Sequence, residues 1–243
     1  MRTLGFCKFV LMETLESMIR NLKKLYIKSD DCLRFSDIET EGFIVIENFM
    51  SERECDHYKV LIDNFITTKD DLVWRDEAKS DERIYFSNKY ISEFDRIFRD
   101  PFIRKALRGY TGCVDPVGFV LANKLSFVDN NAGSGGGWHR DSLINHQFKA
   151  ILYLSNVTSS NGAFQYIRGS NTKLSLFYNF IKGDSIFGKH RFSNNEIDKY
   201  LDQLPERDLV TITGRKGTLL LVDTKGIHRG SPLVHGNRYA LTT

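Results

Sequence analysis

The chain has 243 residues, of which 41% are hydrophobic and 27% charged, as in an ordinary globular protein of one large domain or two small ones. A chain of this length buries enough surface to fold without disulfide bonds or a structural metal. Its formal net charge of +3 is too small to indicate a nucleic acid or a membrane surface as a partner. We therefore expect neither, and the composition leaves the oligomeric state open.

The cysteines and the N-terminal segment indicate a reducing compartment. The chain has four cysteines, Cys7, Cys32, Cys55 and Cys113. They form no C-x-x-C pair and show no zinc-type spacing with histidine, and scattered thiols are typical of reducing compartments. We expect no secretory signal, because Lys8 interrupts the apolar N-terminal segment and no small-residue cleavage site follows. The expected localisation is cytoplasmic, and Met12 is an alternative start of the chain.

The first half of the chain predicts helices around one strand. A helix is expected over residues 12–27, where apolar residues recur at helical spacing at Leu11, Leu15, Met18, Leu22 and Leu25. Residues 42–49 are mostly β-branched or aromatic and predict a strand. A capping box at the start of 51–66 predicts a helix there. A second helical region covers about 92–110 and is interrupted near Pro101.

The second half of the chain predicts mainly strands. Turn-forming residues separate six candidate strands, at 117–129, 148–157, 162–169, 208–213, 218–224 and 238–243. One helix interrupts them at a second capping box, which begins at Ser193. This order predicts a mainly β fold with flanking α-helices, as a sandwich or barrel. We expect a single domain over 1–243, with a helical extension at 1–37, a core at 38–243 and an insertion at 171–207.

One short motif brings two types of metal ligand together. His139 and Asp141 are two residues apart, and on a strand such residues point to the same face. They would form two thirds of a 2-His-1-carboxylate triad, the ligand set of non-haem iron(II). The third ligand has to come from elsewhere, and His228 is the best placed because it follows a buried-looking strand. On its own, the motif also fits an exposed loop.

Arg238 begins the last predicted strand, ten residues after His228. An arginine that points into a barrel needs a buried anion, because an unpaired buried charge is very costly. A bound carboxylate would supply that anion, since guanidinium matches carboxylate in bidentate fashion. Taken alone, the residue fits a solvent-exposed strand edge equally well.

The ordered set of three candidate ligands followed by Arg238 resembles the phytanoyl-CoA dioxygenase-like family of iron(II)/2-oxoglutarate oxygenases. Residues 41–55 are similar to the opening strand and helix of that family. Residues 138–141 are similar to its Trp-His-x-Asp motif, and 161–171 resemble its Asn-Gly to Pro-Gly-Ser-His segment. The resemblance extends from about residue 38 to the end of the chain.

The sequence departs from the family pattern in three places. Pro-Gly-Ser-His is replaced by Arg-Gly-Ser-Asn at 168–171, in a segment that usually supports the fold. The serine that often follows the distal histidine by two positions is here Gly230, and Ser231 comes one position later. The Lys-Pro-Pro-Gly stretch of some relatives is absent, which leaves Lys124 as the nearest basic candidate for the other end of the cosubstrate.

The resemblance implies a double-stranded β-helix, that is, a jelly-roll or cupin-like barrel with helices on one side. It also implies that Fe(II), 2-oxoglutarate and O2 are used, with the metal held by His139, Asp141 and His228. The remote carboxylate of 2-oxoglutarate would bind at Arg238, and further candidates for the pocket are Ser231, Lys124 and Tyr153. The expected reaction is hydroxylation of an aliphatic C–H bond in a small metabolite or biosynthetic intermediate, with release of succinate and CO2.

Two loops are candidates for covering such a site. The glycine run at 133–137 lacks the Gly-Lys-Ser/Thr of a phosphate loop and is not followed by a helix, so we expect a flexible entry loop. Residues 171–195 form the longest insertion between predicted strands, as lids and substrate loops commonly do. Basic residues in or beside these loops fit either an anionic small-molecule substrate or a solvated surface, namely Arg140, His146, Lys182, Lys189, His190 and Arg191.

Two other functions stay open on the sequence alone. One is a non-catalytic jelly-roll protein that binds a ligand, which the intact set of candidate ligands disfavours. The other is a cupin-like metalloenzyme that does not use 2-oxoglutarate, such as an isomerase. Such an enzyme needs no deep carboxylate anchor, so Arg238 disfavours it. Formation of succinate would distinguish both from an oxygenase.

Overall fold

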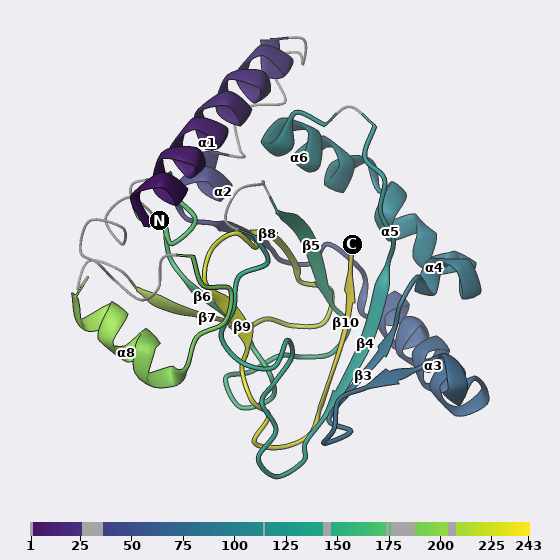
Figure 1. Cartoon of the computed structure of the whole chain (residues 1–243). Helices are drawn as coiled ribbons and strands as arrows, with labels where there is room; N and C mark the ends of the chain where they lie inside the picture. Colours follow the sequence, from purple (N-terminus) through teal and green to yellow (C-terminus); the bar gives the residue numbers. More distant parts are fainter. Residues whose placement is uncertain are drawn as a thin grey trace.

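The computed structural model describes residues 2–25, 36–113, 115–142, 147–173, 175, 188–203 and 208–243. These residues form two antiparallel sheets that face each other (Figure 1). The larger sheet contains, in spatial order, β1 (Phe43–Ile46), β8 (Leu219–Asp223), β5 (Phe148–Tyr153), β10 (Asn237–Thr242), β4 (Leu121–Ser126), β3 (Asp81–Ile84) and β2 (Trp74–Arg75). The smaller contains β7 (Leu209–Ile212), β6 (Phe164–Ile167) and β9 (His228–Gly230).

Helices flank the two sheets, as Figure 1 shows. One group packs on the outer face of the larger sheet: α3 (Glu52–Thr68), α4 (Ser87–Tyr90), α5 (Asp95–Arg99) and α6 (Pro101–Thr111), with short 3-10 turns at Asp70–Leu72 and Ser92–Phe94. The remaining described helices are α1 (Arg2–Leu25), α2 (Ser36–Thr40) and, near the smaller sheet, α8 (Asn194–Gln203). The arrangement confirms the predicted mainly β jelly-roll with flanking helices.

The alternation of side chains along the strands creates two separate cores. In β5, Ile151 and Tyr153 point between the sheets, whereas Ala150 and Leu152 point outward to the helices. Successive residues of a strand point to opposite faces, so one apolar run serves both cores. The space between the sheets is closed by apolar side chains at one end and lined by polar ones at the other, where the candidate site lies.

Local signals in the sequence correctly predict where α3, α6 and α8 begin. Ser51 and Glu54 form the predicted capping box of α3, with side chain and backbone bonded reciprocally. Ser193 makes the same contacts with Glu196 at the start of α8. Pro101 is the first residue of α6, where its missing N–H costs nothing, and this explains the predicted interruption. The six predicted strands are all present; five are shorter than expected, and β10 has the expected length but begins one residue earlier.

Three strands lie outside the prediction, because their sequences carry little apolar alternation. β2 and β9 have two and three residues, and β3 reads Asp-Glu-Arg-Ile. Each is held in the sheet by a neighbouring strand, β3 by β4 and β9 by β6. Tertiary pairing therefore fixes them rather than their own propensity.

The N-terminal helix differs from the expectation. It begins at Arg2 instead of residue 12, and much of its apolar stripe faces solvent, with Leu11 70% and Met18 59% exposed. None of the described helices, α1 included, combines the length and the apolar character needed to cross a membrane. The expected insertion at 171–207 falls partly on 174, 176–187 and 204–207, which lie outside the described residues, as do Cys32, His146 and Lys182.

Candidate metal centre and active site

The three predicted ligands come from two segments that pair side by side. His139 and His228 exchange two backbone hydrogen bonds, each of 2.9 Å. Asp141 donates its backbone N–H to the carbonyl of Thr224, just after β8, also at 2.9 Å. Residues facing each other across an antiparallel pair project to the same side, and so do residues two apart on one strand. This pairing therefore brings both imidazoles and the carboxylate to one face.

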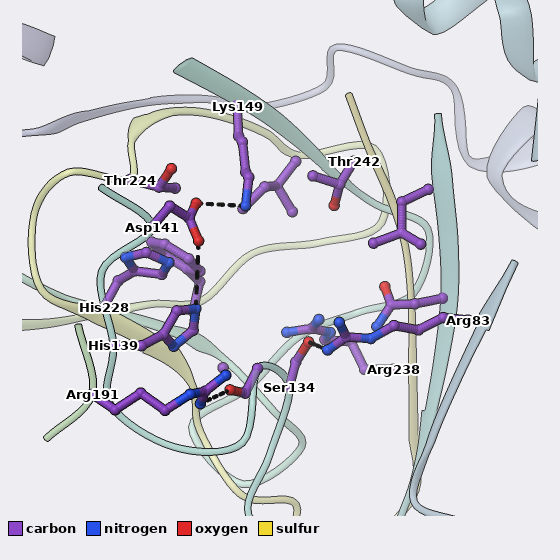
Figure 2. A pocket seen from close by; sticks show the side chains of 16 residues that line it. Arg83, Ser134, His139, Asp141, Lys149, Arg191, Thr224, His228, Arg238 and Thr242 are labelled. Carbon is purple, nitrogen blue, oxygen red and sulfur yellow. Dashed lines mark hydrogen bonds and ion pairs between the residues drawn. The ribbon is translucent and has the colours of Figure 1, made fainter. Parts of the chain in front are cut away.

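Both imidazoles present the same ring nitrogen to the centre of this group (Figure 2). Nδ1 of His139 lies 2.8 Å from the carbonyl oxygen of Gly137, and Nδ1 of His228 lies 2.9 Å from that of Gly226. Since a carbonyl only accepts, these contacts assign the proton to Nδ1 and leave a lone pair on each Nε2. One ligand atom from each of the three side chains lies within 4.8 Å of the other two.

The surroundings set the charge of each group. Burial lowers the pKa of both imidazoles, that of His228 to about 3. Burial alone would raise the pKa of Asp141, but the Lys149 ammonium, 2.6 Å away, outweighs it and holds that pKa at about 2. At neutral pH the site offers two neutral imidazoles and one carboxylate, the protonation states that metal binding requires. The donor set is the facial triad of non-haem iron(II), and the residues fit that metal.

These shifts predict how the stability of the metal-free protein depends on pH. The folded imidazoles resist protonation, whereas an unfolded histidine takes up a proton near pH 6.5, so the unfolded state binds more protons below that pH. The free energy of unfolding should therefore fall as the pH drops from 7 towards 4, by on the order of a few kcal/mol. Urea titrations at several pH values measure this slope.

The matched control is His228→Gln, which keeps a polar side chain but cannot titrate. Its slope of unfolding free energy against pH should be shallower than that of the wild type. Identical slopes in the two proteins would show that the burial of His228 does not couple folding to protonation.

The triad lines a cavity that extends to two arginines on the far side. Figure 2 shows Arg83 and Arg238 opposite the three candidate ligands, with Ser134 beside them. Arg238 lies on β10 and is 4% exposed. Its Nη1 donates to the carbonyl of Gly162 at 2.6 Å, whereas its buried Nε has no hydrogen-bond partner among the described residues. A buried guanidinium with an unused donor fits a carboxylate-bearing ligand in this cavity.

The glycine run at 133–137 packs closely against β9, and its role as a flexible entry loop stays a prediction. The Asn131 side chain makes hydrogen bonds to the backbone of Val128, Gly133 and Leu233. Further along, Gly230 donates its backbone N–H to the carbonyl of Ser134 at 3.1 Å. These bonds hold the start of the loop against residues 230–233, and Ser134 lies over Gly230, the position where the family pattern often has a serine after the distal histidine.

Gly230 leaves no room for a side chain at that position. A Cβ there would lie 2.7 Å from Cβ of Ser134 and 3.3 Å from Nη1 of Arg238. Gly230→Ala should therefore destabilise the protein by about 1–3 kcal/mol, as overpacking does, and lower the Tm by about 2–12 °C. In the Ser134→Gly background the same substitution should cost less, because the clashing Cβ is gone. An equal loss of Tm in both backgrounds would contradict the proposed contact.

The alternation of side chains along β4 contradicts the expectation that Lys124 contacts the cosubstrate. Asn123 and Leu121 line the cavity, so Lys124 points to the opposite face. There its ammonium lies 2.8 Å from Asp63 of α3 and 5.4 Å from the ring centre of Tyr239. Lys124 therefore fastens a helix to the outside of the sheet and does not reach the cosubstrate pocket.

Tyr153 and Ser231 also lie away from the cavity wall. Tyr153 points between the sheets, where its hydroxyl donates to the carbonyl of Ile212 and accepts from the N–H of Phe164, both at 3.0 Å. Both bonds join the larger sheet to the smaller one, so its role is structural. Ser231 is buried and its hydroxyl has no partner in the described part of the chain, but Gly230, not Ser231, lines the cavity beside Arg238.

The cavity also contains cationic and polar side chains that sequence motifs did not single out, among them Arg83, Ser134 and Lys149. Arg83 lies on the unpredicted β3, where it pairs with Asp81 at 2.6 Å. Lys149 is one basic residue in an otherwise apolar strand, which gave no reason to place it beside a metal ligand. Arg191 was among the basic loop residues, and it too lines the cavity.

Comparison with known proteins identifies the family of this chain. The sequence profile of the phytanoyl-CoA dioxygenase family (PhyH) matches residues 38–234. The chain belongs to the phytanoyl-CoA dioxygenase family. This confirms the family that the order of His139, Asp141, His228 and Arg238 had indicated. It also makes the protein a member of the iron(II)- and 2-oxoglutarate-dependent oxygenase class of enzymes, with the cofactors expected from the sequence.

Several solved structures share the fold at low sequence identity. The epimerase SnoN, in complex with Fe3+, α-ketoglutarate and nogalamycin RO, aligns with a TM-score of 0.64 and 13% identity over 86% of this chain and 80% of its own. EctD from S. alaskensis with bound Fe gives 0.63 and 16% over 89% and 75%. HygX from Streptomyces hygroscopicus, with nickel, 2-oxoglutarate and hygromycin B bound, gives 0.56 and 16% over 89% and 86%. No curated protein sequence matches this chain.

Proposed function

We propose that this protein is an Fe(II)- and 2-oxoglutarate-dependent dioxygenase that hydroxylates an aliphatic C–H bond of a small metabolite or biosynthetic intermediate, in a single domain with residues 1–37 as a helical extension. The observation that carries the proposal is one cavity with a His-Asp-His triad on one wall and the buried Arg238 on the other. A cupin-like enzyme without 2-oxoglutarate would have no use for that buried guanidinium.

In this proposal each side chain has a defined task. Both histidines and Asp141 hold the metal, and the carbonyls of Gly137 and Gly226 keep the two rings oriented through Nδ1. When bound, iron(II) with 2-oxoglutarate and O2 supplies the oxidant that attacks the C–H bond, with release of succinate and CO2. Arg238 fixes the remote carboxylate and so sets the direction in which the cosubstrate points.

The remaining lining residues shape the space for the cosubstrate and substrate. Leu121, Ile151 and Phe164 form its apolar part and reduce the access of water. Ser134 and Arg83 lie beside Arg238, with Nη2 of Arg83 3.5 Å from Oγ of Ser134. We assign these two residues to the same end of the pocket as the remote carboxylate, in place of Lys124, Tyr153 and Ser231.

The test is a screen of small metabolites for release of succinate from 2-oxoglutarate, with iron(II), ascorbate and O2. A productive substrate should raise succinate release above the substrate-free rate, and mass spectrometry should show a product with one added oxygen atom. Two of the similar structures are of an epimerase and a carbocyclase. A product without added oxygen would therefore show that the enzyme catalyses an epimerisation or a ring closure instead of a hydroxylation. The absence of succinate with all substrates would favour a non-catalytic protein.

A further inference from the structure

The cavity carries more positive charge than the metal, its ligands and the cosubstrate together balance. Fe(II), Asp141, the two carboxylates of 2-oxoglutarate and Arg238 together carry no net charge. Of the other cations that line the cavity, Arg83 is neutralised by Asp81, whose Oδ2 accepts from Nε and Nη2 at 3.0 and 2.6 Å. Lys149 and Arg191 then add two positive charges that nothing in this set balances.

Pairing with the segment of His139 places Arg191 on the same face as the candidate metal ligands. It faces His139 directly across an antiparallel bridge, so both side chains project to the same side. Its Nη1 donates to the carbonyls of Gly135 at 2.8 Å and Gly136 at 3.3 Å, which holds the guanidinium at the cavity. In the described part of the chain no carboxylate pairs with it, so its other donors are available to a ligand.

Lys149 approaches the triad from the other side in Figure 2. It shares its strand face with Ile151, and both line the cavity. Its ammonium contacts Asp141 Oδ2, and its side chain is 39% exposed. The negative charge of Asp141 already balances one charge of the metal, so the positive charge of Lys149 stays unbalanced in the enzyme with metal and cosubstrate bound.

We infer that the substrate carries an oxyanion, a carboxylate or a phosphate monoester, that Arg191 and Lys149 bind beside the metal. The inference rests on the proposed function and adds the class of substrate. With a neutral or cationic substrate, these two solvent-accessible cations would face the cavity without a counter-charge. An oxyanion balances them, and a guanidinium held by two carbonyls is already oriented for it.

The experiment uses the full chain loaded with cobalt(II) and 2-oxoglutarate, and small probes that each carry a methyl group. Broadening of the methyl proton signal by the metal reports binding close to the triad. Acetate and methyl phosphate should bind saturably, whereas acetamide, the neutral match of acetate, should not. Arg191→Gln and Lys149→Gln should each weaken binding of the anions about 10- to 100-fold.

Lys189→Gln is the matched control, because it removes the same charge two residues from Arg191, from an ammonium that pairs with Glu196 outside the cavity. It should bind the probes as the wild type does. Equal binding of acetate and acetamide would overturn the inference. So would unchanged anion binding in Arg191→Gln and Lys149→Gln, which would place the anion on the metal alone.

Binding of cobalt(II) and 2-oxoglutarate distinguishes a failure of this inference from a failure of the proposed function. The dissociation constants of cobalt(II) and 2-oxoglutarate are measured first in every variant, and in Arg191→Gln that of 2-oxoglutarate should stay within about threefold of the wild type. A large increase would assign Arg191 to the cosubstrate and overturn the inference. If the wild type binds neither cobalt(II) nor 2-oxoglutarate, the proposed function itself is wrong.

Discussion

His139→Ala, Asp141→Ala and His228→Ala are each expected to lose iron(II) binding and to reduce turnover to background while the protein stays folded. The three ligand atoms lie within 4.8 Å of one another and come from separate positions on two paired segments. Removing any one leaves two donors, which is too few for a facial site. The measurements are the metal content after dialysis, the succinate release rate and the thermal unfolding curve.

The control for these variants is His235→Ala. His235 is exposed and contacts Ser160 at 2.9 Å, away from the cavity, so its loss should change neither metal content nor turnover. His228 is buried, and His228→Gln provides a second variant that leaves a smaller void. Stoichiometric iron in any folded ligand variant would show that the triad is not the metal site.

Arg238→Ala should raise the dissociation constant of 2-oxoglutarate roughly 30- to 3000-fold. Truncating one partner of a buried charge pair costs about 2–5 kcal/mol, and 1.4 kcal/mol is a factor of ten. Arg238→Lys should recover only part of the affinity, because ammonium keeps the charge but loses the bidentate fork. Iron affinity without cosubstrate should hardly move, since Arg238 lies across the cavity from the triad.

The stability of the cosubstrate-free protein provides an independent check on Arg238. Its guanidinium is buried and its Nε lacks a partner within the residues that the structure describes, so the arginine is costly when no anion is bound. Arg238→Met should therefore leave the Tm unchanged or raise it in the absence of 2-oxoglutarate, while abolishing the stabilisation that 2-oxoglutarate gives the wild type. A strong loss of Tm without ligand would mean that Arg238 is mainly structural.

The sequence predicted those parts of the site that depend on short motifs. His139 and Asp141 are two residues apart, and any extended backbone brings them to one face. His228 and Arg238 follow or begin strongly apolar strands, whose positions are evident from composition. The Arg-Gly-Ser-Asn segment also has the expected supporting role, since Asn171 donates to the carbonyl of Ile38 at 2.9 Å.

Other parts depend on register and long-range contact, which composition does not specify. The strand around Lys124 was expected, but a shift of one residue decides whether Lys124 or Asn123 faces the cavity. Lys149 stands beside Asp141 only because β5 pairs with β8. Ser134 lies next to Arg238 because a loop nearly a hundred residues away in sequence packs on Gly230. Each case requires the fold before the residue can be assigned.

The most direct test of the central claim is the visible absorption of the protein mixed with iron(II) and 2-oxoglutarate without oxygen. Chelation of the bound metal by the cosubstrate should produce a metal-to-ligand charge-transfer band that saturates at one equivalent of iron per chain. The band should be absent in Asp141→Ala and should require far more 2-oxoglutarate in Arg238→Ala. If the wild type binds iron but shows no such band at saturating 2-oxoglutarate, the protein is a metal-binding jelly-roll that does not use this cosubstrate.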